Sequence, residues 1–183
     1  ARLAEELVST DIVEDIGRLY AGERYVRADL GVYDEVHAAL EGADIVITAT
    51  TASDPVFAAD ELSPGAHITA MGQYTPGRTE LDIETVRRAR YVPDLRARAL
   101  QDAGSFLAAR DAGVVGDAHI VAELGEVLAD PSLGRTDPAE LTIFDSGGTA
   151  VETVGAAAML YERAVERGMG QPLDIRPGSE TFS

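Results

Sequence analysis

The chain has 183 residues, of which 45% are hydrophobic, and it carries a formal net charge of −17 with no cysteine. All 15 basic residues are arginine, so lysine is absent as well. These absences exclude disulfides, thiolate chemistry, a Schiff base and a Walker-type phosphate lysine from these residues. The length and apolar content suit a domain of α/β size, and the acidic charge disfavours nucleic acid and anionic membranes as partners.

Helix-like and strand-like segments alternate along the chain. No stretch of 18 uncharged apolar residues occurs, and residues 1–10 lack a hydrophobic signal-peptide core, so we expect a cytoplasmic protein without a membrane span. In chain order, the pattern predicts the end of a helix at 1–8, a strand at 24–28, a helix at 32–40, a strand around 45–47, a strand at 67–72, a helix at 83–89, a strand at 91–94, mostly helix over 95–129, a strand at 141–144 and a long helix after Thr149.

Two local patterns add detail to these elements. The continuous apolar run Ile45–Ile47 predicts a strand that is covered on both faces. Thr149 and Glu152 have the spacing of a capping box, which marks the start of the last helix.

The alternation of strands and helices predicts an α/β fold with an open, doubly wound parallel sheet. In such sheets, ligands bind beyond the carboxyl ends of the strands. This rule selects three candidate segments, at residues 48–53, 71–78 and 145–149. Each also has a simpler explanation as a turn or helix start, because Thr, Ser, Pro and Gly are common there.

The residues of these segments suit a planar or anionic ligand. Arg78 could hold a carboxylate or phosphate through its fork of donors, and the glycine-rich link at 145–149 precedes a helix N-terminus that could accept an anion. The only G-x-G, at 168–170, follows the last helix and has no strand before it, so the chain carries no dinucleotide-binding fingerprint. The three histidines lack metal-ligand spacing, and we expect no metal site.

Several motifs, read in order, resemble one known family. The strings ADIVITATT, DPVF, PGAHITAMG and PGRTELD are followed by AELGEVLA, TIFDSGGTA and AAAMLYERA, from about Asp44 to Ala164. This series is similar to that of the ornithine cyclodeaminase/μ-crystallin family. The resemblance implies an NAD- or NADP-dependent homodimer that acts on a small amino or imino acid, each subunit joining a Rossmann domain to a dimerisation and substrate domain.

The resemblance also implies a division of the chain. Residues 1–148 would form a partial Rossmann domain that lacks its first βαβ part. Residues 149–170 would form a long helix that returns to the dimerisation domain, and residues 171–183 a tail. The family's G-x-G-x-x-A strand and catalytic lysine have no counterpart here, and we expect both upstream of Ala1.

Site residues follow from the resemblance position by position. Arg78 stands where many members have a lysine, and it keeps the charge. Gly147 matches a backbone position near the substrate, and Tyr74 stands where ornithine cyclodeaminases have a proton-shuttling aspartate. The implied cofactor contacts are Thr48, Ile68, Thr69, Ala70, Met71, Arg78 and Ser146.

Tyr74 is the main departure from the cyclodeaminase pattern. A tyrosine hydroxyl is protonated at neutral pH, so Tyr74 cannot pair with a substrate ammonium as an aspartate would, although it can still act as an acid. This departure widens the expected substrates to other amino and imino acids.

The activity that the resemblance implies first is ornithine cyclodeaminase-like conversion of a small amino acid, in which hydride leaves Cα, an imine forms, ammonia is lost and hydride return gives proline. One alternative is an amino-acid dehydrogenase or ketimine reductase of the same family. The other alternative is a non-catalytic NAD(P)-binding protein similar to μ-crystallin.

The dispersed carboxylates predict a protein adapted to high salt. Asp and Glu are spread from Glu5 to Glu180 without a long run of like charge, and arginine is the only cation. A GC-rich genome is the alternative explanation. Because salt screens repulsion among surface carboxylates, we expect thermal denaturation to show a lower midpoint as the salt concentration is reduced. A midpoint that ignores salt would contradict this hypothesis.

Overall fold

A computed structural model describes residues 7–9, 23–25 and 33–171 of the chain. The chain divides into two units, residues 1–148 and 149–183, and each is described here by itself. The strands are β1 (Leu7–Ser9), β2 (Glu23–Tyr25), β3 (Ile45–Thr48), β4 (His67–Ala70), β5 (Arg90–Pro93) and β6 (Thr142–Asp145), and the α-helices are α1 (Tyr33–Leu40), α2 (Ile83–Arg88), α3 (Arg96–Asp102), α4 (Gly104–Asp111), α5 (Leu124–Ala129) and α6 (Ala150–Glu166).

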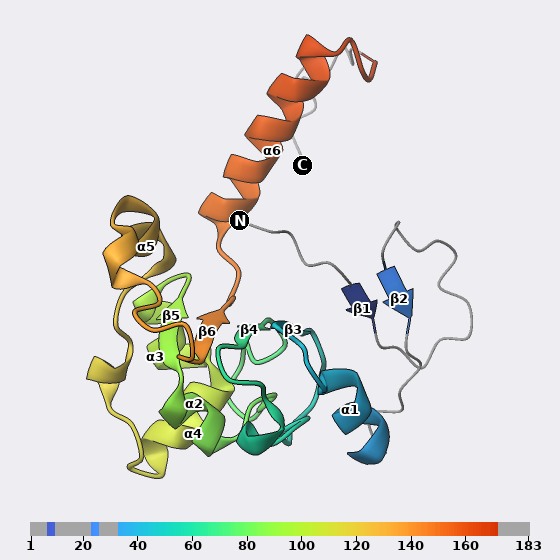
Figure 1. Ribbon diagram of the computed structural model, residues 1–183. Helices are drawn as coiled ribbons and strands as arrows, with labels where there is room; N and C mark the ends of the chain where they lie inside the picture. The colour runs from blue at the N-terminus through green and yellow to red at the C-terminus, as the bar shows by residue number, and fades with distance from the viewer. Residues whose placement is uncertain (1–6, 10–22, 26–32, 172–183) are drawn as a thin grey trace, which may run out of the picture. The chain divides into compact units, whose positions relative to one another are not determined.

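The first unit contains a four-stranded, all-parallel sheet in the order β3-β4-β6-β5 (Figure 1). Strand β6 enters between β4 and β5, although it comes last in sequence. Parallel neighbours cannot be joined by hairpins. The chain crosses over through a loop with the 3-10 turn Ala59–Glu61 between β3 and β4, through α2 between β4 and β5, and through α3, α4 and α5 between β5 and β6. This arrangement confirms the predicted parallel α/β fold.

The first predicted element differs from the structure. Leu7–Ser9 forms strand β1, which pairs in parallel with β2, rather than the end of a helix. The apolar spacing of Leu3 and Leu7 is a weak signal over so short a segment, and pairing with a distant strand overrides it. The rest of the predicted helix at 1–8, and residues 26–28 of the predicted strand, lie outside the described residues.

Each strand of the four-stranded sheet buries one face more deeply than the other. Val46, Ile68, Ile143 and Tyr91 are register partners across the sheet, and all four are buried. Tyr91 also packs against Phe106 of α4, with ring centroids 5.0 Å apart and the planes tilted by 47°, an arrangement that aromatic pairs favour. The hydrophobic core therefore lies on this face.

The prediction that Ile45–Ile47 is covered on both faces is wrong. Ile45 is 54% and Ile47 61% exposed, while Val46 and Thr48 point into the core. The physical reason is that Ile45 and Ile47 lie on the face opposite the core, and a run of apolar residues predicts burial without showing whether a second layer covers that face.

The second unit contains α6, whose start matches the sequence prediction. The Thr149 side chain accepts a hydrogen bond from the Glu152 amide at 3.2 Å, and the Glu152 carboxylate accepts one from the Thr149 amide at 3.0 Å. These bonds form the predicted capping box. Within the described part of the chain, no helix is both long and apolar enough to cross a membrane.

Gly104, the first residue of α4, packs closely against the backbone of the turn at residues 75–78. A Cβ on Gly104 would lie 1.9 Å from the carbonyl oxygen of Arg78 and 2.9 Å from that of Thr75, both backbone atoms. We therefore expect Gly104→Ala to lower the free energy of unfolding by about 3 kcal/mol.

The matched control is Gly125→Ala in α5, where an added Cβ meets nothing within 4 Å. Because alanine is the better helix former, this control should be neutral or slightly stabilising in denaturant titrations. Equal effects of the two substitutions would contradict the packing at Gly104.

Candidate functional site

The three candidate segments meet at one edge of the sheet. In the sheet register, Thr48 is level with Ala70, Ala70 with Asp145, and Asp145 with Pro93. The chain leaves each strand at this level, so the segments after β3, β4 and β6 begin side by side. The structure thus brings together 48–53, 71–78 and 145–149, as the rule for parallel sheets predicts.

A buried carboxylate, Glu80, connects the first two segments. Its Oε2 accepts hydrogen bonds from the Thr48 hydroxyl at 2.8 Å and the Gly72 amide at 2.7 Å, and its Oε1 accepts one from the Thr50 amide at 2.5 Å. Glu80 itself is fully buried. A buried carboxylate is tolerated when donors surround it in this way.

The segment after β4 ends in a tight turn that exposes Tyr74. Gly77 has φ of +84°, and the Arg78 amide donates to the carbonyl of Thr75 at 3.2 Å, which closes the turn. Tyr74 is 45% exposed. Arg78 Nη1 donates to the Tyr74 hydroxyl at 3.3 Å, and its guanidinium carbon lies 5.2 Å from the ring centroid. Tyr74, the predicted catalytic residue, and Arg78, which is predicted to contact the cofactor, thus form one pair.

A second buried carboxylate, Asp145, ends β6 directly before Ser146. The side-chain amide of Gln73 donates to Asp145 Oδ1 at 2.9 Å, and the carboxyl group also receives a hydrogen bond from Tyr91. Burial raises the pKa of Asp145 to about 6; these two hydrogen bonds oppose the rise, and the charges of Asp94 and Glu80 add to it. Asp145 therefore titrates close to neutral pH.

Asp94, the residue directly after β5, supports the third segment. Its Oδ2 accepts from the Gly148 amide at 2.7 Å, and its Oδ1 accepts from the Leu95 amide at 2.6 Å. Gly148 has φ of +77°, a conformation that glycine adopts readily. The Asp94 carboxylate thus holds the link after Ser146 and Gly147 in place.

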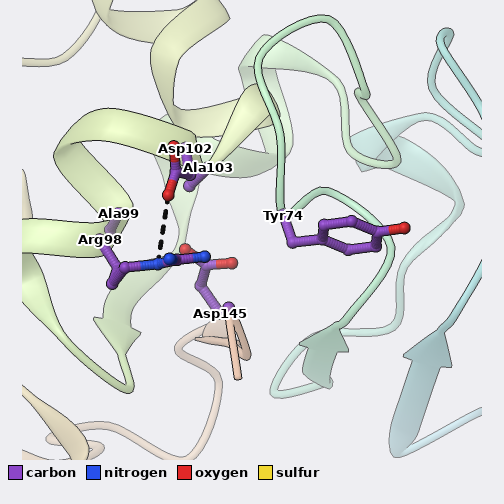
Figure 2. A pocket seen from close by; sticks show the side chains of 7 residues that line it. Tyr74, Arg98, Ala99, Asp102, Ala103 and Asp145 are labelled. Carbon is purple, nitrogen blue, oxygen red and sulfur yellow. Dashed lines mark ion pairs between the residues drawn. The ribbon is translucent and has the colours of Figure 1, made fainter. Parts of the chain in front are cut away.

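A small pocket of about 10 Å³, the space of one water molecule, opens beside these groups. Its lining includes Tyr74, Asp145 and Gly147 together with Arg98 and Asp102 of α3. Figure 2 shows the Tyr74 ring extending away from the ion pair that Arg98 Nε makes with Asp102 Oδ2 at 3.2 Å. The pocket itself holds at most a very small group, so any larger ligand would lie over the open edge.

The predicted cofactor residues differ in what they present at this edge. Thr48, Ile68 and Ala70 are buried, at 5%, 0% and 0% exposure, so their side chains face the core. Met71 is 45% exposed, whereas Thr69, Arg78, Ser146 and Gly147 are half-buried. The roles of all these residues stay predictions. In the described ranges, no group of three or more His, Asp or Glu side chains could hold a metal ion.

Sequence reasoning missed the buried polar residues that organise the edge. Glu80 and Asp82 stand out in the sequence only as carboxylates near Tyr74, and neither is free to replace a proton-shuttling aspartate. Glu80 is occupied by three donors, and Asp82 caps α2 by accepting from the Thr85 amide at 2.7 Å. Gln73 gave no signal, because a glutamine in a turn is ordinarily exposed.

The titration of Asp145 gives a testable pH dependence. The folded state holds the Asp145 proton up to about pH 6, whereas an unfolded aspartate releases it near its usual value of 3.8. Ionising the buried Asp145 carboxyl therefore destabilises the folded protein, and this loss of stability develops as the pH rises from about 3.8 to about 6. We expect the free energy of unfolding of Asp145→Asn, relative to wild type, to rise by about 3 kcal/mol between acidic and mildly alkaline pH. Urea titrations across this range measure it, and a difference independent of pH would contradict the buried carboxyl.

Comparisons with known proteins identify the family to which this site belongs. The Δ1-pyrroline-2-carboxylate reductase of Bacillus cereus is 35% identical over 163 residues, which cover 86% of this chain and 50% of the relative. The mouse ketimine reductase mu-crystallin is 37% identical over 137 residues, covering 75% and 41% of the two chains. The chain therefore spans about half the length of the curated relatives it matches.

A solved structure agrees with these sequence matches. The Δ1-pyrroline-2-carboxylate reductase of Thermococcus litoralis, in complex with NADH and L-proline, superimposes with a TM-score of 0.74 at 30% identity and covers 92% of this chain and 53% of that one. A sequence model of the ornithine cyclodeaminase/mu-crystallin family matches residues 18–168. The chain belongs to the ornithine cyclodeaminase/mu-crystallin family.

Proposed function

We propose that this chain is the cofactor-binding part of an NAD(P)-dependent oxidoreductase that interconverts a small imino acid and the corresponding amino acid. One observation carries the proposal: the segments after β3, β4 and β6 meet at one edge, with Tyr74 and Gly147 beside the same pocket. Relatives with reductase names, one of them solved with NADH and L-proline, support this direction.

The residues at the edge fit the nicotinamide end of NAD or NADP. Ser146 and Gly147 are half-buried, and Met71 is exposed beside them, so a flat ring can approach backbone and small side chains. The pyrophosphate would have to be held elsewhere, because the chain carries no G-x-G-x-x-G/A fingerprint.

When bound, the nicotinamide would supply or accept the hydride at the substrate carbon. The chain's own task is then to orient the two molecules and to move a proton. Tyr74 would donate that proton to the imine nitrogen, since its hydroxyl lies at the open edge beside Arg78. Arg78 contributes a positive charge that can hold a substrate or cofactor anion.

Tyr74 also favours imine reduction over ornithine cyclisation. A cyclodeaminase must manage a second substrate ammonium group, for which an anionic aspartate at this position is suited. Glu80 and Asp82 are both engaged in structural hydrogen bonds and do not replace it. Cyclodeamination, with loss of ammonia and formation of proline, remains the second candidate because the family includes it by name.

The two units of the chain are proposed to serve different ends. Residues 1–148 would form most of the nucleotide-binding domain, and residues 149–170 would carry α6 into a subunit contact of a homodimer, followed by the tail at 171–183. The apolar side chains of α6 are open within its own unit: Val151 is 82% exposed and Tyr161 71% exposed. Such a face needs a partner to be stable in water.

The activity test uses protein expressed from the complete coding sequence. We expect NADH or NADPH to be oxidised with Δ1-pyrroline-2-carboxylate, and no ammonia to be released from ornithine with NAD⁺. Pyruvate with ammonia tests the dehydrogenase alternative. Tight cofactor binding without turnover on any of these would favour a binding protein, and would contradict the proposed reaction.

Tyr74→Phe tests the proton donor in the same assay. Loss of the hydroxyl should lower kcat by about 100-fold while the cofactor Kd changes little, because general acid catalysis contributes on this order. Ser132→Ala removes the hydroxyl of an exposed residue in the 3-10 turn before β6 and serves as the control. Equal kcat values for Tyr74→Phe and wild type would remove Tyr74 from the reaction.

A further inference from the structure

We propose that Glu80 is the positioning residue of the cofactor edge: its buried carboxylate holds the segments after β3 and β4 together in the arrangement that receives the nicotinamide. The inference rests on the proposed function and deepens it. It assigns to Glu80 a role in placing other groups, without contact to substrate or cofactor.

The first step is the fixed position of Glu80 itself. The Val56 amide donates to the Glu80 carbonyl at 3.0 Å, and the adjacent Leu81 forms a parallel bridge with Phe57. Leu81 and Phe57 are both buried in the core. The backbone that carries the carboxylate is therefore anchored at Val56 and Phe57, further along the connection from residues 48–53.

The second step is the set of donors that Glu80 satisfies. Two of its three partners are backbone amides, of Thr50 and Gly72, and the third is the Thr48 hydroxyl. Thr50 lies past the end of β3 and Gly72 past the end of β4, where no further strand pairing supplies acceptors. A buried amide without an acceptor is costly, so the carboxylate determines where these two amides can lie.

The third step is the lack of space around this contact. A Cβ on Gly72 would lie 2.1 Å from the Thr50 carbonyl oxygen and 2.3 Å from Glu80 Oε1. Glycine at 72 thus lets the two segments approach until one carboxylate can reach both. Met71, which is proposed to meet the cofactor, is the neighbour of Gly72 in the chain, so this contact also fixes its position.

The principal experiment compares wild type with Glu80→Gln, in the complete protein. The amide group of glutamine presents N–H toward donors that need an acceptor, while size and shape are kept. Without cofactor, we expect hydrogen exchange at the Thr50 and Gly72 amides to accelerate at least about tenfold, and exchange at Ile143 in β6 to stay unchanged. With cofactor, the Kd for NADH should rise at least about tenfold.

Val86→Ala provides the control for lost stability. Val86 is fully buried in α2, and its backbone amide donates to the Asp82 carbonyl rather than to Glu80. This variant should lower the melting temperature without changing the Kd for NADH. Wild-type exchange rates at Thr50 and Gly72 in Glu80→Gln would overturn the inference. So would an increase in the Kd for NADH that is no larger than the increase in an equally destabilised Val86→Ala.

A second pair of variants decides the matter if Glu80→Gln does not fold. Thr48→Ser keeps the hydroxyl that donates to Glu80, and Thr48→Val removes it while keeping the side-chain shape. Without cofactor, Thr48→Val should show faster exchange at the Thr50 amide, and Thr48→Ser should keep the wild-type exchange rate there. Equal behaviour of the two variants would overturn the inference.

These measurements also separate this inference from the proposed function. A wild-type protein that binds neither NADH nor NADPH contradicts the proposed function. Exchange at Thr50 and Gly72 is measured without cofactor, and it decides in that case whether Glu80 holds the two segments.

Discussion

The backbone at the carboxyl end of the parallel sheet depends on one constraint, which is the burial of two polar side chains, Thr48 and Asp145, in the last row of the core face. Thr48, Ala70, Asp145 and Pro93 are level in register and face the same side as the apolar row of Val46, Ile68, Ile143 and Tyr91. Thr48 and Asp145 must therefore find hydrogen-bond partners inside the protein. Glu80 supplies the partner for Thr48, and Gln73 and Tyr91 supply those for Asp145. These bonds set the positions at which the chain leaves the strands.

The same constraint explains how structure and chemistry are divided at this edge. The buried polar groups hold the backbone, while the exposed or half-buried groups, Tyr74, Arg78 and Ser146, remain available to a ligand. The buried carboxylates of Glu80 and Asp145 thus hold other groups in position. The resemblance places Tyr74 where ornithine cyclodeaminases have an aspartate, and this difference supports our proposal of imine reduction rather than cyclisation.

Much of this arrangement could be predicted from the sequence. The carboxyl-end rule places 48–53, 71–78 and 145–149 at one edge because it depends on the parallel direction of the strands, which the alternating pattern indicates. The role of Glu80 could not be predicted, since its partners lie 8 to 32 residues away and depend on how two loops approach. The exposure of Ile45 and Ile47 was missed because an apolar run does not show whether both faces of a strand are covered.

The most direct test of the account is a crystal structure of the complete protein with bound NADH. The account predicts that the nicotinamide lies over the segments after β4 and β6, against Met71 and Ser146, while Glu80 keeps its bonds to the Thr50 and Gly72 amides. A nicotinamide bound away from this edge, or a Glu80 carboxylate turned toward the cofactor, would contradict it.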